Sequence, residues 1–131
     1  MQPLHLPLRS FVSDAVWLEA VTDQERALAR TYDSALYRFY DANGVFLYVG
    51  VSRNLPDRWN WHRCRTQWYE HARYVALSFY PRRDDAFRAE AASIRTHHPE
   101  FNAIRCRTRS KYRVADDPAW VPPQPHRLDR G

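Results

Sequence analysis

The chain has 131 residues, enough for one domain with a single hydrophobic core, which excludes a multidomain assembly. Hydrophobic residues make up 44% of the sequence but form no long apolar run, so we expect no membrane span. The formal net charge of +5 is unevenly carried, because the segment from Val51 to Arg113 alone sums to +8, and such clustering favours a polyanionic partner.

The predicted elements begin with a helix and a hairpin. Thr22 and Glu25 have the spacing of a capping box, which predicts a short helix over residues 22–30. Two strands, over 34–40 and 45–51, are predicted on either side of the turn signal Asn43-Gly44.

A helix, a strand and a last helix follow. Asn54 and Pro56 are typical of a helix start, so a helix is predicted from Asn54 to about 67–69. A strand over 74–80 and an alanine-rich helix over 86–96 complete the order helix, β, β, α, β, α. We therefore predict an α/β domain of the α+β kind, with a small, mainly antiparallel three-stranded sheet and packed helices.

The C-terminal part differs in composition from the rest. Of the 20 basic residues all but one are arginines, and arginine holds phosphate through two parallel hydrogen bonds. In an extended conformation one side of the segment 105–113 would be wholly basic. This predicts contacts with a nucleic-acid backbone by Arg105, Arg107, Arg109, Lys111 and Arg113.

The predicted hairpin brings two phenols together. With a two-residue turn, the expected pairs are Asp41 with Phe46, Phe39 with Tyr48, and Tyr37 with Gly50. Tyr37 and Tyr48 then share one face. A four-residue loop keeps them on one face, whereas a three-residue loop separates them. Gly50 leaves room for something to approach the backbone, and the alternative reading is a routine aromatic pair in the core.

The two later helices carry ionisable residues at helical spacing. Arg58 and His62 lie one turn apart at the edge of an apolar stripe, which also fits an exposed polar edge. Glu90 lies on the apolar face of the last helix, where a carboxylate needs either an arginine or a divalent metal. Together these groups meet the needs of phosphodiester hydrolysis: a base, a cation for the phosphate, and a metal.

At these residues the chain resembles the GIY-YIG nuclease superfamily. Ala35-Leu36-Tyr37 and Tyr48-Val49-Gly50 stand where that family has its two tripeptides, at a separation typical of it. Arg58, His62, Glu90 and Asn102 fall on its remaining motif positions, and the resemblance extends from Ser34 to about Ile104. It divides the chain into an N-terminal extension with a short helix (1–33), a nuclease core (34–104) and a basic, then proline-rich, tail (105–131).

The resemblance also implies roles. Glu90 would bind one Mg²⁺ or Mn²⁺, Arg58 would stabilise the scissile phosphate, and Tyr37 or Tyr48 would activate water, with Tyr37 the first choice. His62 would orient or protonate groups near the phosphate, and Asn102 would hold the architecture of the site. Some members carry a lysine just after the second tripeptide, where this chain has Val51, and Arg53 is the candidate replacement.

The sequence thus predicts a metal-dependent DNA endonuclease. Its rivals are a catalytically weak or inactive nucleic-acid-binding module of the same fold, and an interaction protein whose proline-rich tail docks on a partner. Two cysteines without a disulfide framework, and no secretory signal, lead us to expect a cytoplasmic protein. The sequence leaves open whether the substrate is DNA or RNA and whether it is single-stranded or duplex. It also leaves open the cleavage specificity, the biological pathway and the oligomeric state.

Overall fold

The computed structural model describes residues 1–13 and 15–102, and the elements below are those of that part of the chain. The N-terminal segment contains β1 (Leu4–His5), β2 (Arg9–Ser10), α1 (Trp17–Ala20) and α2 (Asp23–Thr31). It is followed by β3 (Ser34–Asp41), β4 (Phe46–Ser52), α3 (Leu55–Arg65), the 3₁₀ turn η1 (Tyr69–His71), β5 (Ala72–Tyr80) and α4 (Arg83–His97).

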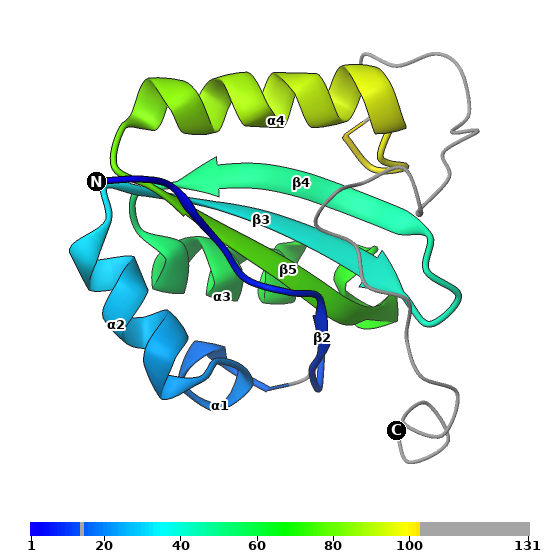
Figure 1. The fold of residues 1–131 in the computed structure, drawn as a ribbon. Coiled ribbons are helices and arrows are strands. Elements are labelled where there is room, and N and C mark those ends of the chain that lie inside the picture. Colours follow the sequence, from blue (N-terminus) through cyan, green and yellow to red (C-terminus); the bar gives the residue numbers. More distant parts are fainter. Residues whose placement is uncertain (14, 103–131) are drawn as a thin grey trace.

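The strands form one antiparallel sheet between two layers of helices. The strand order is β1-β5-β3-β4, with β2 also paired to β5. Helix α4 covers one face, and α1, α2 and α3 lie on the other (Figure 1). The α+β class and the antiparallel sheet are confirmed, but the predicted number of three strands is wrong. The added strands, β1 and β2, have two residues each, too few to produce a sequence period.

Local sequence signals explain where the helices begin. The Thr22 hydroxyl accepts a hydrogen bond from the Glu25 amide at 3.1 Å, and the Glu25 carboxylate accepts one from the Thr22 amide at 2.9 Å. This is the predicted capping box, and it starts α2. The Asn54 side chain caps α3 in the same manner by accepting from the Asp57 amide at 3.3 Å. Both predicted helix starts are therefore confirmed.

The β3–β4 hairpin combines a three-residue loop with a bulge. The Asp41 amide donates a hydrogen bond to the Val45 carbonyl at 3.0 Å. Gly44 has a φ of 83°, the positive value that such a loop needs. By itself this loop would put Tyr37 and Tyr48 on opposite faces. A register shift between Phe39 and Tyr40 restores the pairs Phe39–Tyr48 and Tyr37–Gly50. The predicted pairing at the tyrosines is confirmed, although the predicted pair Asp41–Phe46 is wrong.

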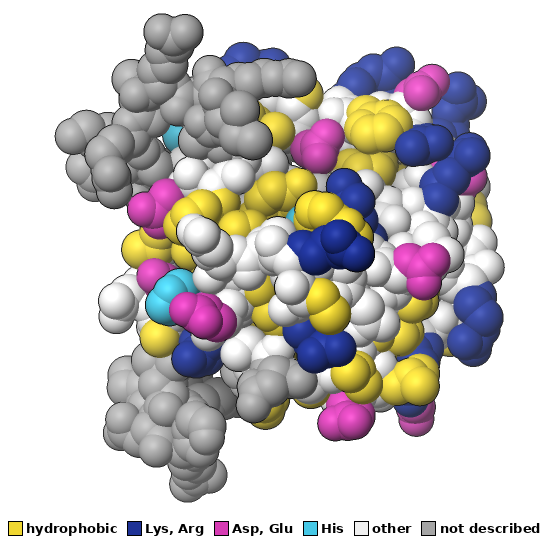
Figure 2. All heavy atoms as spheres, turned by 180° about the vertical axis from the view of Figure 1, so that it is seen from behind, with side chains coloured by type: hydrophobic (Ala, Val, Ile, Leu, Met, Phe, Trp, Pro, Cys, Tyr) yellow, Lys and Arg dark blue, Asp and Glu magenta, His cyan; other side chains and the backbone are white. Residues whose placement is uncertain are grey.

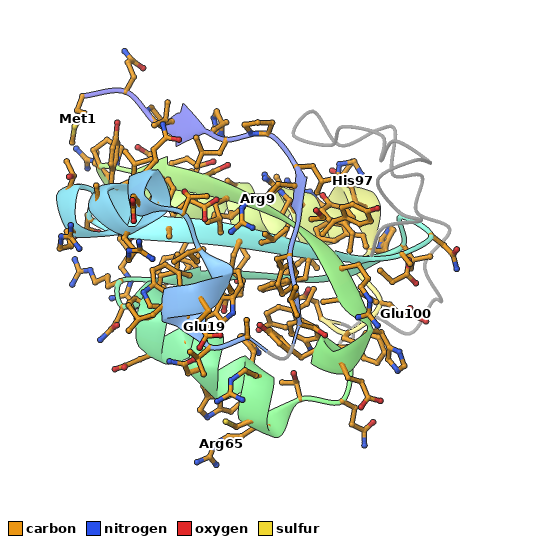
Figure 3. The ribbon with its side chains drawn as sticks, turned by 90° about the horizontal axis from the view of Figure 1, so that it is seen from below. Met1, Arg9, Glu19, Arg65, His97 and Glu100 are labelled. Carbon is orange, nitrogen blue, oxygen red and sulfur yellow. The ribbon has the colours of Figure 1, made fainter. Side chains whose placement is uncertain are left out.

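The N-terminal segment is part of the hydrophobic core. Phe11 and Trp17 are buried, and their rings lie 5.4 Å and 5.6 Å from the ring of Trp59 on α3. Arg9 donates to both oxygens of the buried Glu25 at 2.7 Å and 2.6 Å, and to the Ala20 carbonyl at 2.8 Å. Figure 3 shows Arg9 on the segment that runs beside β5 before the chain enters α1. These contacts fasten α1 and α2 to the sheet.

In the described part of the chain, no helix combines the length and the apolar character needed to cross a lipid bilayer.

Candidate active site

Tyr37 and Gly50 are cross-strand partners at the centre of the candidate site. Tyr37 is 2% exposed, and a Cβ atom at position 50 would overlap its hydroxyl group and ring. The space left by Gly50 is therefore occupied by the phenol of Tyr37, where we had expected room for another group to approach. Tyr48 stacks on Tyr37 with ring centroids 6.1 Å apart, so the structure brings the two phenols together.

His62 on α3 joins this pair from below the sheet. Its Nε2 atom lies 2.9 Å from the Tyr37 hydroxyl oxygen, and the side chain is 1% exposed. The imidazole ring is 4.8 Å from the Tyr48 ring, while Trp68 stacks on Tyr48 at 5.0 Å. The histidine and both tyrosines thus form one aromatic cluster in which a hydrogen bond connects Tyr37 to His62.

Burial sets the protonation of this cluster. Desolvation, with a smaller effect from the charge of Arg58, lowers the pKa of His62 to about 4, so the imidazole is neutral at pH 7. Desolvation also raises the pKa of Tyr37, whereas a hydrogen bond from Arg58 and the positive charge of Arg58 lower it. Desolvation is also the main reason that the pKa of Tyr48 is raised. At pH 7 a neutral phenol therefore faces a neutral imidazole.

Arg58 supplies the positive charge of the site. It lies one turn before His62 on α3, is exposed to solvent, and its guanidinium carbon stands 4.8 Å from the centre of the Trp61 ring. Its charge acts on Tyr37, Tyr48 and His62 alike, which places it beside all three. An exposed guanidinium next to buried neutral groups is suited to bind a phosphate.

Glu90 approaches from α4, on the other side of the sheet. Its charge raises the pKa of both Tyr37 and Tyr48, and its own pKa is raised by desolvation. No hydrogen bond or ion pair engages this carboxylate among residues 1–13 and 15–102. A half-buried carboxylate of this kind lacks a positive partner, and a divalent cation would supply one.

The donor set fits a hard divalent ion that prefers oxygen ligands, such as Mg²⁺ or Mn²⁺. In the described ranges no three His, Cys, Asp or Glu side chains gather around one point. Magnesium commonly takes one or two carboxylates and completes its octahedron with water and substrate phosphate oxygens. A half-buried carboxylate that has no ion pair among the described residues meets that requirement, so Glu90 is the residue that could hold the ion.

Asn102 acts on the backbone of the edge strand β4. Its Oδ1 accepts from the Val49 amide at 2.7 Å, and its Nδ2 donates to the Val49 carbonyl at 2.8 Å. The Glu100 amide donates a hydrogen bond to the Phe46 carbonyl, and the Phe101 amide donates one to the Leu47 carbonyl. Val49 lies between Tyr48 and Gly50, so this clamp fixes the strand that carries one phenol and makes room for the other.

The remaining predicted residues lie elsewhere. Arg53 pairs with Asp33 at 3.2 Å, beyond the end of β4. The tail arginines and Lys111 fall outside the described residues. The site predicted from the sequence does not include Trp61 and Trp68. Trp68 is buried against Tyr48, whereas Trp61 is 41% exposed beside Arg58. The position of Trp61 next to two helix arginines, at i−3 and i+4, was the signal available.

Comparison with known proteins identifies the family. The family model described as the GIY-YIG catalytic domain matches residues 33–104, more than half of the chain. Searches of curated proteins and of solved structures return no match. The matched range contains both tyrosines, Arg58, His62, Glu90 and Asn102. On this match, the chain belongs to the GIY-YIG family.

Proposed function

We propose that this protein is a divalent-metal-dependent endonuclease that hydrolyses phosphodiester bonds of DNA. The observation that carries the proposal is the carboxylate of Glu90, which lies beside two tyrosines and has no ion pair among the described residues, with an exposed arginine next to the same phenols. The family consists of nucleases in general, which supports the reaction class. The substrate, the metal and the roles of the residues are our inference from the site.

Proton transfer is assigned to Tyr37, and His62 is the residue that orients it. At pH 7 both groups are neutral, and the 2.9 Å contact lets Nε2 of the imidazole accept a hydrogen bond from the phenol, which holds the Tyr37 hydroxyl in place. An imidazole whose pKa is lowered to about 4 is a weak proton acceptor, so Tyr37 takes the proton from the attacking water as phenolate, which the hydrogen bond and the charge of Arg58 favour. Tyr48 has no such hydrogen bond to His62 among the described contacts, which makes Tyr37 the better base.

Arg58 and Glu90 handle the charge that develops on the phosphate. The Arg58 guanidinium would bind the non-bridging oxygens, whose negative charge increases in the transition state. Glu90 would hold Mg²⁺ or Mn²⁺, which when bound stabilises the leaving oxygen as a Lewis acid. Hydrolysis along this route requires no covalent enzyme intermediate.

The test is the conversion of supercoiled plasmid to nicked and linear forms with Mg²⁺ or Mn²⁺, with EDTA as the metal-free control. We expect cleavage by the wild type and a loss of at least about 100-fold in Glu90→Gln, because the metal would lose its protein ligand. The matched control is Asp84→Asn, which removes an exposed carboxylate from the first turn of the same helix and should cleave normally.

Other outcomes of this assay decide between the candidates. DNA binding without cleavage by the wild type, across several substrates and both metals, would support the binding-module reading instead. A loss of folding in Glu90→Gln, seen as a lower melting temperature, would reveal a structural carboxylate. We expect an unchanged melting temperature, since no hydrogen bond or ion pair of the described residues is removed.

A further inference from the structure

A basic cavity lies where the N-terminal helices meet the start of α3. Its volume is about 300 Å³, and it is lined by residues of α1 and α2 on one side and of the β4–α3 connection on the other. The lining includes three arginines and four apolar side chains, namely Arg26, Arg30, Arg53, Trp17, Leu18, Ala29 and Pro56. No acidic residue of the described part of the chain lines it. A cavity of this size can hold one nucleotide unit.

Two of the three arginines are held in place from outside the cavity. Arg26 pairs with Asp23 and donates to the Leu18 carbonyl at 2.9 Å, while Arg53 pairs with Asp33 at 3.2 Å. Neither aspartate lines the cavity. An arginine restrained in this way loses less conformational entropy when it binds a ligand, so these two guanidinium groups are preorganised.

The third arginine brings an uncompensated charge. Arg30 is exposed in the last turn of α2 and makes no ion pair within the described residues. In Figure 2, arginine side chains gather toward the right-hand side, the end of the molecule at which β4 ends and α3 and α4 begin. Three arginines and no acidic residue of the described part of the chain line the cavity, so an anion is attracted to it.

The cavity and the candidate active site share the first turns of α3. Asn54, which lines the cavity, accepts through its carbonyl a hydrogen bond from the Arg58 amide at 3.1 Å. Four residues along a helix correspond to a rise of about 6 Å. A DNA strand whose scissile phosphate lies at Arg58 therefore passes the cavity within a few nucleotides.

We propose that this cavity binds a phosphate of the DNA strand that flanks the scissile phosphate, with the attached sugar and base against its apolar wall. The inference rests on the proposed function for its substrate, and it assigns a substrate-binding task to the N-terminal segment, which lies mostly outside the family match. Arg30 contacts the phosphate directly, and Arg26 and Arg53 complete the positively charged wall.

The test is binding of a fluorescein-labelled DNA duplex in EDTA over a range of salt concentrations, so that no cleavage is needed. Arg30→Gln should weaken binding about three- to tenfold and reduce the slope of log K against log salt by about one. The matched control is Arg95→Gln, which removes an exposed arginine from the last turn of α4 and should leave the slope unchanged.

A second variant tests the cavity itself. Leu18 is 67% exposed, so Leu18→Glu should fold normally while it places a carboxylate in the lining and weakens binding further. Equal affinities and slopes for Arg30→Gln, Arg95→Gln and the wild type would overturn the proposal. Weakened binding by Arg30→Gln in a protein that never cleaves DNA would support the cavity and contradict the proposed nuclease.

Discussion

His62 is the residue whose protonation ties the stability of the protein to the candidate site. In the folded protein its pKa is lowered to about 4, against 6.5 for an unburied histidine. Between these two pH values the unfolded chain binds the proton more readily than the folded chain. The free energy of unfolding should therefore fall as the pH is lowered from 6.5 to 4, by up to about 3 kcal/mol for this residue.

Urea denaturation over this pH range, in the wild type and in His62→Gln, checks this prediction. The variant should be less stable near neutral pH, because the Tyr37 hydroxyl loses its partner, but its stability should depend less on pH. The matched control is His71→Gln, which changes an exposed histidine and should keep the wild-type slope. Parallel slopes for all three proteins would show that His62 titrates normally.

At the scale of single residues, the sequence predicted which candidate side chains lie together better than it predicted the reason for Gly50. The tyrosine pairing, the arginine and histidine one turn apart, and the lone carboxylate all follow from periods of two and 3.6 residues. The overlap between a Cβ at position 50 and Tyr37 depends on the rotamer that the Tyr37 side chain adopts on the neighbouring strand. No pattern within one segment contains that information.

At the scale of elements, the clamp on β4 is the feature that most directly links fold and site. Asn102→Ala removes both hydrogen bonds to the Val49 backbone and should cost about 2 kcal/mol of stability. It should also speed hydrogen exchange at the Val49 amide, because that group then faces solvent on the open edge of the sheet. Amide exchange followed by NMR, together with thermal unfolding, checks both effects.

Asn102→Asp provides the graded control for the clamp. The carboxylate still accepts from the Val49 amide but cannot donate to the Val49 carbonyl, so its effects should lie between those of the wild type and Asn102→Ala. Equal exchange rates at Val49 in all three proteins would show that the Asn102 clamp does not protect this amide.

The start of a helix was predictable where a single side chain caps it. The capping box at Thr22 and the cap at Asn54 are local, so sequence was sufficient for both. The bulge that restores the tyrosine register, and the short strands β1 and β2, are imposed by distant partners on β3 and β5. Such tertiary effects leave no recognisable local pattern.

At the scale of the whole molecule, the N-terminal segment belongs to the core that supports the family domain. Removing residues 1–33 would expose Phe39 and Trp59, which pack against Phe11 at 5.5 Å and 5.4 Å. We expect the truncated chain to lose cooperative thermal unfolding and its near-UV circular dichroism signal, because the aromatic core loses one wall. A truncated protein with a sharp melting transition would show that the rest of the chain folds without the N-terminal segment.

The pairing of the N-terminal segment with β5 also constrains the order of folding during synthesis. His5 and Ser78, whose side chains are 2.8 Å apart, are separated by 73 positions in the chain. The N-terminal segment, which is synthesised before β5, therefore cannot form these pairs until β5 is available. Until β5 has emerged, Phe11 and Trp17 have no complete core to enter, and this part of the nascent chain depends on being kept from other exposed apolar surfaces.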